Sequence, residues 1–230
     1  MAKELKFNEK KHQYTIDKKV LTSVTTFVKK FFKPFDVKQI SKYCAKARRN
    51  KGEKVTAYDV RREWKATAKE GTRIHELIEM YIMCENKKIS VTQTNTKALV
   101  GADFFDDLML KYPDYTPVAE ERVYDEELGI AGTIDLVLYG ENGEVVLVDW
   151  KTNKKIRTSG TKTSIGTAVV KDCSLTHYTL QLSLYAYILE RKGFKPEKLS
   201  IAHLTEDGCN EVVMDYRKDL IELMIEGNVA

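Results

Sequence analysis

Residues 132–151 read Gly132-Thr-Ile-Asp135-Leu-Val-Leu-Tyr139, then Gly-Glu-Asn-Gly, then Glu144-Val-Val-Leu-Val-Asp149-Trp-Lys151. Two runs rich in β-branched and aliphatic residues flank the turn at 140–143, so this stretch predicts a β-hairpin. Side chains alternate between the two faces of a strand, which places Asp149 and Lys151 on one face and Trp150 in the core. Asp135, at the head of the neighbouring strand, is expected to reach the same end of the hairpin.

The charges at this end of the hairpin allow two interpretations. Two carboxylates and one ammonium at the edge of an apolar hairpin cost free energy unless they hold a cation or pair with one another. Carboxylate oxygens suit Mg²⁺ or Mn²⁺, so a divalent metal site is the first interpretation. The second is a solvated strand end, because Asp-x-Lys alone is a common pattern.

Two predicted helices flank the hairpin. Upstream, the apolar residues 74, 77, 78, 81 and 82 have helical spacing, and His75 lies beside that apolar stripe. Gly71, one turn earlier, costs a helix up to about 1 kcal/mol, which favours a close approach to a ligand or another backbone there. Downstream, Gln181 and Tyr185 share one face of a predicted amphipathic helix. Taken singly, a helical histidine and a polar fringe on a core helix are ordinary structural features.

In this order, the pieces resemble the PD-(D/E)XK nuclease superfamily, and within it the RecB-like exonuclease branch. The motifs are Gly71-x-x-x-His75 on a helix, Gly132-x-x-Asp135 on a strand, Asp149-Trp150-Lys151 on the next strand and Gln181-x-x-x-Tyr185 on the following helix. The chain is most similar to compact phage-type and mitochondrial-genome-maintenance-type exonucleases, over nearly its whole length and most securely over 71–190. The stretches 5–14 and 21–25 are similar to the start of those phage proteins. Ile134 stands where the superfamily's name has proline, a substitution that is common in this branch.

The resemblance implies a metal-dependent DNA exonuclease that acts on single strands or duplex ends in replication, recombination or repair. It assigns catalysis to Asp135, Asp149, Lys151, Gln181 and Tyr185, and Mg²⁺ or Mn²⁺ binding to His75, Asp135, Asp149 and the Trp150 carbonyl. Lys151 would orient or help to deprotonate the attacking water and would stabilise the transition state. Gln181 and Tyr185 would position that water or the DNA strand. Either Glu120 or Glu121 could assist, because alternation lets only one of them face the site.

Two other functions remain open within this fold. The first is a structure-specific endonuclease that cuts flaps. The second is a catalytically silent module that binds DNA or a protein partner; such modules typically lose a ligand or the lysine, whereas this chain keeps them all. Some relatives carry a four-cysteine iron–sulfur cluster, but Cys44, Cys84, Cys173 and Cys209 include no C-x-x-C pair. We therefore expect no such cluster.

Positive charge is concentrated in two parts of the chain. Residues 1–70 hold 20 Lys/Arg against 8 Asp/Glu, a net charge of +12, whereas the remainder has a net charge of −8. Residues 151–171 contain six basic residues and no acid, and we expect them to form a long loop. A single lysine run is typical of a solvated face, but the two basic regions together favour a polyanion. The predicted DNA contacts are Lys154, Lys155, Arg157, Lys162, Gln181 and Tyr185.

The element pattern predicts an α/β fold, with a mixed central β-sheet flanked by helices as in a restriction-endonuclease-like core. One nuclease domain is expected over 1–230, with a basic N-terminal hairpin and helices in 1–65 and the PD-(D/E)XK core in 66–230. The expected strands are 5–8, 13–21, 118–124, 130–139, 145–151, 198–204 and 211–216. The expected helices are 23–32, 36–50, 56–84, 95–110, 175–192 and 217–227.

Composition is ordinary for a folded soluble protein, with 43% hydrophobic and 31% charged residues. No apolar run approaches the roughly 20 residues that span a bilayer, and the N-terminal sequence has no apolar signal region. We expect a protein of the bacterial or phage-infected cytoplasm that has no contact with membranes. Its expected partner is DNA, with a recombinase or a single-strand-binding protein as a further candidate.

Overall fold

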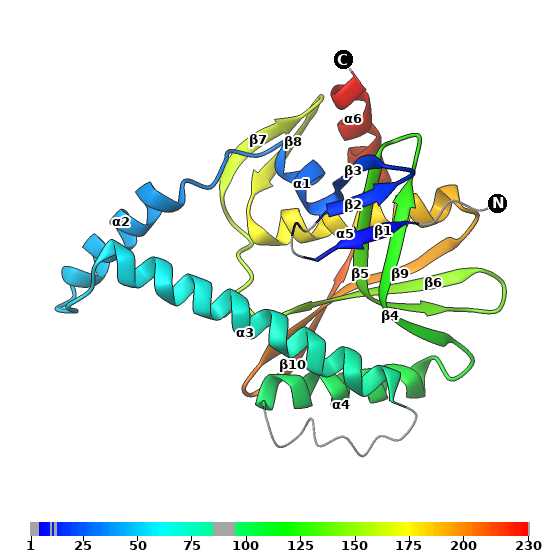
Figure 1. Ribbon diagram of the computed structural model, residues 1–230, viewed down its shortest axis with the longest axis horizontal. Helices are drawn as coiled ribbons and strands as arrows, with labels where there is room; N and C mark the ends of the chain where they lie inside the picture. Colours follow the sequence, from blue (N-terminus) through cyan, green and yellow to red (C-terminus); the bar gives the residue numbers. More distant parts are fainter. Residues whose placement is uncertain (1–4, 10, 12, 85–94, 230) are drawn as a thin grey trace.

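The computed structural model describes residues 5–9, 11, 13–84 and 95–229. Within these residues, eight strands form one sheet in which β1, β2, β3, β5, β6, β9 and β10 follow one another and β4 pairs with β5 (Figure 1). The strands are β1 (Lys6–Asn8), β2 (Gln13–Ile16), β3 (Lys19–Ser23), β4 (Thr116–Asp125), β5 (Ile130–Tyr139), β6 (Glu144–Lys151), β9 (Lys195–Thr205) and β10 (Gly208–Met214).

Helices cover both faces of this sheet. They are α1 (Val24–Lys29), α2 (Val37–Arg49), α3 (Ala57–Met83), α4 (Thr96–Lys111), α5 (Ser174–Arg191) and α6 (Lys218–Val229). Apolar residues of α1, α5 and α6 form one core with the sheet, and those of α3 and α4 form a second core. The strand β6 runs parallel to β9, whereas β5 runs antiparallel to both β4 and β6. The predicted mixed central sheet flanked by helices is therefore confirmed.

The hairpin that dominates the sequence forms as predicted. Its turn is closed by the Gly140 N–H, which donates to the Glu144 carbonyl at 2.8 Å, and Gly143 has a φ of +85° that glycine adopts readily. Trp150 is 2% exposed and packs edge-on against Phe104, with ring centroids 6.0 Å apart. Its predicted place in the core is therefore confirmed.

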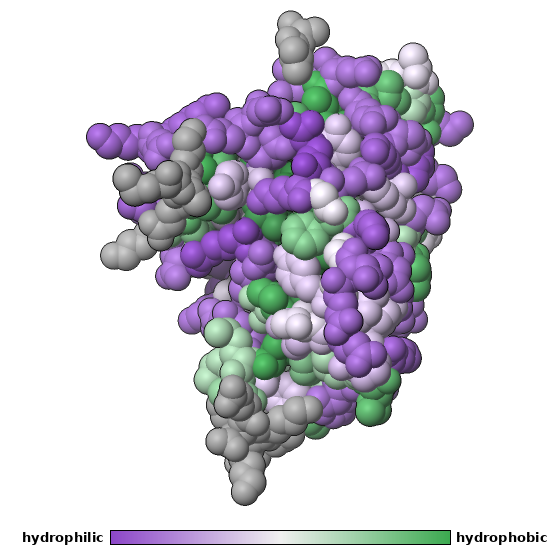
Figure 2. All heavy atoms as spheres, turned by 90° about the vertical axis from the view of Figure 1, so that its right-hand side faces the viewer, coloured by the Kyte–Doolittle hydropathy of each residue, from purple (hydrophilic) through white to green (hydrophobic). Residues whose placement is uncertain are grey.

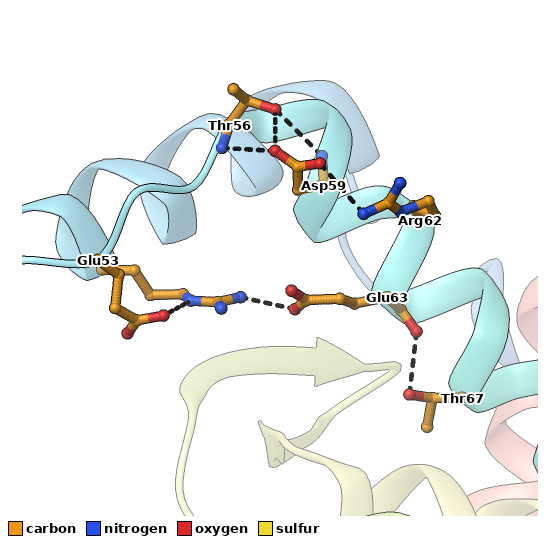
Figure 3. Close-up of polar contacts among 7 residues, drawn as sticks. Glu53, Thr56, Asp59, Arg62, Glu63 and Thr67 are labelled. Atoms are coloured by element: carbon orange, nitrogen blue, oxygen red, sulfur yellow. Dashed lines mark hydrogen bonds and ion pairs between the residues drawn. The ribbon is translucent and has the colours of Figure 1, made fainter.

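The helix α3 begins with a reciprocal capping arrangement. The side chain of Thr56 accepts from the Asp59 N–H, and the Thr56 N–H donates to the Asp59 carboxylate, as Figure 3 shows. Arg48, at the end of α2, pairs with both Glu53 and Glu63 and thereby ties α2 to α3. In Figure 1, α2 and the first half of α3 project beyond the sheet.

Three segments differ from the sequence prediction. Residues 13–21 form two strands rather than one, because Asp17 and Lys18 both adopt positive φ values, which suit a tight hairpin turn. The segment 151–171 is not all loop: it contains the hairpin of β7 (Thr161–Ile165) and β8 (Ala168–Asp172), which turns at Gly166 with a φ of +55°. The helix α1 ends at Lys29 instead of residue 32, and residues 30–32 make shorter-range turn hydrogen bonds.

The surface is mainly hydrophilic on the face that Figure 2 presents, with hydrophobic side chains in small separate patches. Among the described residues, no helix has the length and apolar content needed to cross a bilayer.

Candidate active site

A cleft of about 1260 Å³ lies between α3, the strands β4–β6 and α5. Most of the predicted site residues line it, namely His75, Asp135, Trp150, Lys151, Gln181 and Tyr185. Asp149 is only 4% exposed, but it contacts both Lys151 and Gln181. The fold therefore gathers side chains from four separate parts of the chain at one position.

Asp135 occupies the point where β5 and β6 separate. The two strands pair from Tyr139–Val145 to Leu136–Val148 and no further, and the Trp150 N–H donates to Asp135 Oδ2 at 2.8 Å. The alternation of β5 also breaks here, since Ile134 belongs to the core beneath α5 and Leu136 to the core beneath α3. This irregularity brings the Asp135 carboxylate into the cleft.

His75 of α3 and Glu120 of β4 meet Asp135. The Nδ1 atom of His75 lies 3.5 Å from Asp135 Oδ2, and one ligand atom from each of the three residues lies within 4.8 Å of the others. Glu120 has a φ of +49°, an uncommon conformation for a residue other than glycine that costs about 1–3 kcal/mol. Glu121 is not part of this group, because it accepts a hydrogen bond from the Tyr139 hydroxyl at 3.3 Å.

Asp149 and Lys151 form an ion pair on the α5 side of the cleft. Lys151 Nζ lies 2.5 Å from Asp149 Oδ2, and Gln181 Nε2 donates to Asp149 Oδ1 at 3.1 Å. The ring of Tyr178 stands below the ammonium, with its centroid 4.6 Å from Nζ. Although the ion pair is close, Asp149 Oδ2 has no donor in hydrogen-bonding geometry, so this buried oxygen keeps its capacity to bind a cation.

Two glycines allow the helices to approach the strands. A Cβ atom on Gly71 would lie 3.1 Å from Thr152 Oγ1, so α3 passes close to the end of β6, one turn before His75. A Cβ atom on Gly132 would lie 2.6 Å from a ring carbon of Tyr185. Tyr185 is 4% exposed, so its side chain forms part of the wall of the cleft rather than its open surface.

The two buried aspartates have opposite pKa shifts. Burial alone would raise the pKa of Asp135, but the charges of His75 and Lys151 and the Trp150 N–H outweigh burial and lower it. Burial raises the pKa of Asp149, and the charge of Asp135 adds to this effect although Lys151 opposes it. Asp135 is thus favoured as a carboxylate, whereas the charged form of Asp149 is less favoured than in water and is supported by Lys151.

The remaining groups of the cleft also titrate abnormally. Burial opposes the charge of His75, but the negative charge of Asp135 and Asp149 raises its pKa to about 9. Burial, together with the charges of Asp135 and Glu79, raises the pKa of Glu120 to about 7. The pKa of Lys151 is raised by Asp149 and Asp135 in spite of burial. In the absence of a further cation, the cleft therefore binds protons at neutral pH.

These residues fit a divalent metal ion. One imidazole nitrogen, several carboxylate oxygens and an unsatisfied buried oxygen form a donor set that Mn²⁺ and Mg²⁺ accept. The group within mutual reach is His75, Glu120 and Asp135, so Glu120 joins two of the predicted ligands. Coordination by Asp149 and by the Trp150 carbonyl stays a prediction, as does the absence of an iron–sulfur cluster.

The predicted DNA-contacting residues occupy two locations. Lys154, Lys155 and Arg157 line a groove beside the cleft, and Lys154 lines the cleft as well. Lys162 is exposed on β7 and lines neither the groove nor the cleft.

Two aromatic residues that line both the cleft and the groove were not predicted from the sequence, namely Trp64 and Tyr178. Of these two, only Tyr178 has a sequence feature that could have predicted it. It lies three residues before Gln181 on the same helix, where neighbouring side chains can share a face.

A known protein family matches the part of the chain that carries this site. The model of the PD-(D/E)XK nuclease superfamily matches residues 46–208. Two solved structures are distantly similar. The protein SSO0001 has 15% identity and a TM-score of 0.32, over 67% of this chain and 72% of that one. A Eubacterium rectale protein named "Putative exonuclease" has 12% identity and a TM-score of 0.41, over 69% of this chain and 64% of its own. No curated protein matches the chain significantly.

Proposed function

Because the chain belongs to the PD-(D/E)XK nuclease superfamily, we propose that it is a metal-dependent DNA exonuclease that acts on single strands or duplex ends. The observation that supports this proposal most is the cleft in which His75, Glu120 and Asp135 lie within mutual reach. The Asp149–Lys151 ion pair adjoins these three residues.

His75, Glu120 and Asp135 would hold Mg²⁺ or Mn²⁺, with Asp149 and the Trp150 carbonyl as further ligands. When bound, the ion would lower the pKa of water and stabilise negative charge on the scissile phosphate. Imidazole favours softer ions than Mg²⁺, so Mn²⁺ is expected to support at least comparable activity.

Lys151 would act as a fixed positive charge in this reaction. Its pKa is raised by Asp149 and Asp135, so it remains an ammonium at neutral pH and can donate to the phosphate or to the attacking water. Asp149 and the Tyr178 ring hold the ammonium from two sides. These contacts favour transition-state stabilisation and water orientation over proton abstraction.

Gln181 and Tyr185 would act as positioning residues. Gln181 fixes the orientation of the Asp149 carboxylate through its 3.1 Å hydrogen bond to Oδ1, while Oδ2 faces the Lys151 ammonium. Tyr185 packs against Gly132 and so holds α5 against β5. A direct contact of either residue with DNA is part of the proposal.

We further propose one nuclease domain over 1–230 that works in DNA replication, recombination or repair, in the cytoplasm of a bacterium or a phage-infected cell. A recombinase or a single-strand-binding protein is the partner proposed besides DNA. A flap-cutting endonuclease is the second candidate activity, since the same site chemistry serves both.

Digestion of end-labelled DNA tests the proposal. Linear single strands and duplexes labelled at the 5′ or 3′ end are incubated with Mg²⁺ or Mn²⁺ beside a circular single strand and a flap substrate. An exonuclease releases short labelled products from one end and leaves the circle intact. Cleavage of the circle or at the flap junction would replace the exonuclease by an endonuclease, and an absence of cleavage on all substrates would refute both.

A further inference from the structure

A second groove, of about 1140 Å³, lies between α2, the first half of α3 and the segment that follows β6. It shares Trp64, Asn153, Lys154 and Tyr178 with the active-site cleft, so the two are continuous. Tyr178 also contacts Lys151. A chain lying in the groove would therefore reach the ammonium group of the proposed active site.

Aromatic side chains form one part of the groove. Phe35 is 61% exposed, and its ring centroid lies 5.7 Å from that of Trp64 with an interplanar angle of 58°. Val37 and Ile40 extend the apolar lining along α2. The fold thus presents flat apolar side chains to solvent beside a proposed phosphodiesterase site.

Basic side chains form much of the remaining lining, together with Asn153, Ser174 and Tyr178. The charged residues of the groove are all basic, namely Arg61, Lys65, Lys154, Lys155 and Arg157. The positively charged surface continues along α2, which contains no Asp or Glu and exposes Lys38, Lys42, Lys46 and Arg49. The fifth basic residue of α2, Arg48, is neutralised by Glu53 and Glu63. This charge is complementary to a polyanion and unfavourable for most apolar ligands.

We propose that this groove binds single-stranded DNA, with bases stacked on Phe35 and Trp64 and phosphates held by the basic residues. An aromatic surface beside a basic track is the arrangement that binds unpaired strands, because each base has a free face. In a duplex, both faces of every internal base are covered by neighbouring bases, so Phe35 has nothing to stack on. The inference rests on the proposed nuclease function and names its substrate class.

Intrinsic fluorescence reports on binding to the groove and the adjoining part of the cleft, because Trp64 lines both. The chain has two tryptophans, and Trp150 is 2% exposed, so quenching by an added oligonucleotide reports on Trp64. The titration uses a dT oligonucleotide and a matched duplex with EDTA present, which separates binding from hydrolysis. We expect quenching and tighter binding with the single strand.

Three variants test the role of stacking. Phe35→Ala should raise the Kd for the single strand at least about fivefold, since one base–aromatic stack is worth about that factor or more. Phe35→Tyr should restore the affinity, because a phenol ring stacks equally well. Tyr58→Ala is the matched control, since Tyr58 is a 65% exposed aromatic of α3 that lines neither the groove nor the cleft. Circular dichroism verifies that each variant is folded.

An unchanged Kd for folded Phe35→Ala, or equal affinity for duplex and single strand, would overturn the inference. Metal-dependent cleavage of labelled DNA, measured in parallel on wild-type protein, distinguishes the two proposals. If the protein cleaves DNA but its binding does not depend on Phe35, the groove proposal is wrong and the nuclease proposal stands. If binding depends on Phe35 but no DNA is cleaved, the groove proposal stands and the nuclease proposal is wrong.

Discussion

Tyr185 of α5 occupies the space beside Gly132 of β5 that a side chain at position 132 would need. A Cβ atom on Gly132 would lie 2.6 Å from Tyr185 Cε1 and 2.8 Å from the Tyr185 hydroxyl oxygen. Gly132 lies on the same strand as Asp135, and Tyr185 lies one helical turn after Gln181. This contact therefore fixes the distance between the strand and the helix that carry the site.

Gly132→Ala should destabilise the protein by about 1–3 kcal/mol, because the added methyl group displaces a buried ring. Urea unfolding monitored by circular dichroism measures the loss. Gly227→Ala is the control, since Gly227 lies in α6 with nothing within 4 Å of an added Cβ atom. That change should be neutral or stabilising by up to about 1 kcal/mol. Equal stability of the two variants would show that Tyr185 moves aside for the methyl group without a loss of free energy of unfolding.

Glu120→Gln should weaken Mn²⁺ binding at least about tenfold, because a neutral amide replaces a carboxylate ligand. Isothermal titration calorimetry measures the affinity, and Glu121→Gln is the matched control from the adjacent position. Glu121 accepts from the Tyr139 hydroxyl and lies outside the ligand group. If both variants bind Mn²⁺ as the wild type does, Glu120 is not a ligand.

Metal affinity should rise with pH. The pKa of His75 is raised to about 9 and that of Glu120 to about 7, so both groups carry protons at the acidic end of the neutral range. A metal ion must displace these protons, which increases the apparent affinity by up to about tenfold per pH unit for each proton released. Titrations between about pH 6 and pH 8, in buffers with different ionisation enthalpies, measure both effects.

His75→Ala should weaken metal binding and reduce its dependence on pH, because one of the displaced protons is lost with the imidazole. Affinity that is independent of pH in the wild type, with no proton release, would contradict the proposed ligand set.

Replacing Lys154, Lys155 and Arg157 together with alanine should flatten the salt dependence of single-strand binding. Each lost phosphate contact reduces the slope of log K against log salt by about 0.7, so the triple change removes about 2 units. Fluorescence anisotropy at several salt concentrations measures the slope. Lys111→Ala, at the exposed end of α4, is the control. Lys162→Ala, tested alone, reports whether β7 also contacts DNA. An unaltered slope in the triple variant means that the groove does not hold the backbone.

The local sequence pattern was sufficient to predict the part of the fold that carries the site. The β5–β6 hairpin and the helix that bears His75 have strong periodicity, and their bounds agree with the prediction to within about two residues. The β7–β8 hairpin was missed because β7 is polar except for Ile165, and the apolar residues of β8 are limited to Ala168–Val170, a run too short to predict a strand. Gly166, flanked by Ile165 and Thr167, was its available turn signal.

The site was less predictable than the fold, because two of its features depend on tertiary geometry. Glu120 reaches Asp135 from a left-handed backbone conformation that no local motif indicates. Trp64 and Phe35 are ordinary aromatic residues in the sequence, and only the packing of α2 against α3 brings their rings together. By contrast, the shared face of Asp149 and Lys151 followed directly from strand alternation.

Single-turnover cleavage by wild-type protein and Lys151→Ala tests the central claim most directly. Each protein is in excess over the labelled single-stranded DNA, at a concentration that binds all of it, and Mn²⁺ is saturating, so differences in metal and DNA affinity do not contribute to the rate. Thermal unfolding of the variant verifies its fold. We predict cleavage by the wild type that EDTA abolishes, and a rate for Lys151→Ala that is lower by at least about a hundredfold, as for loss of a preorganised electrostatic donor. Equal rates for the two proteins, or wild-type cleavage that survives EDTA, would contradict the account.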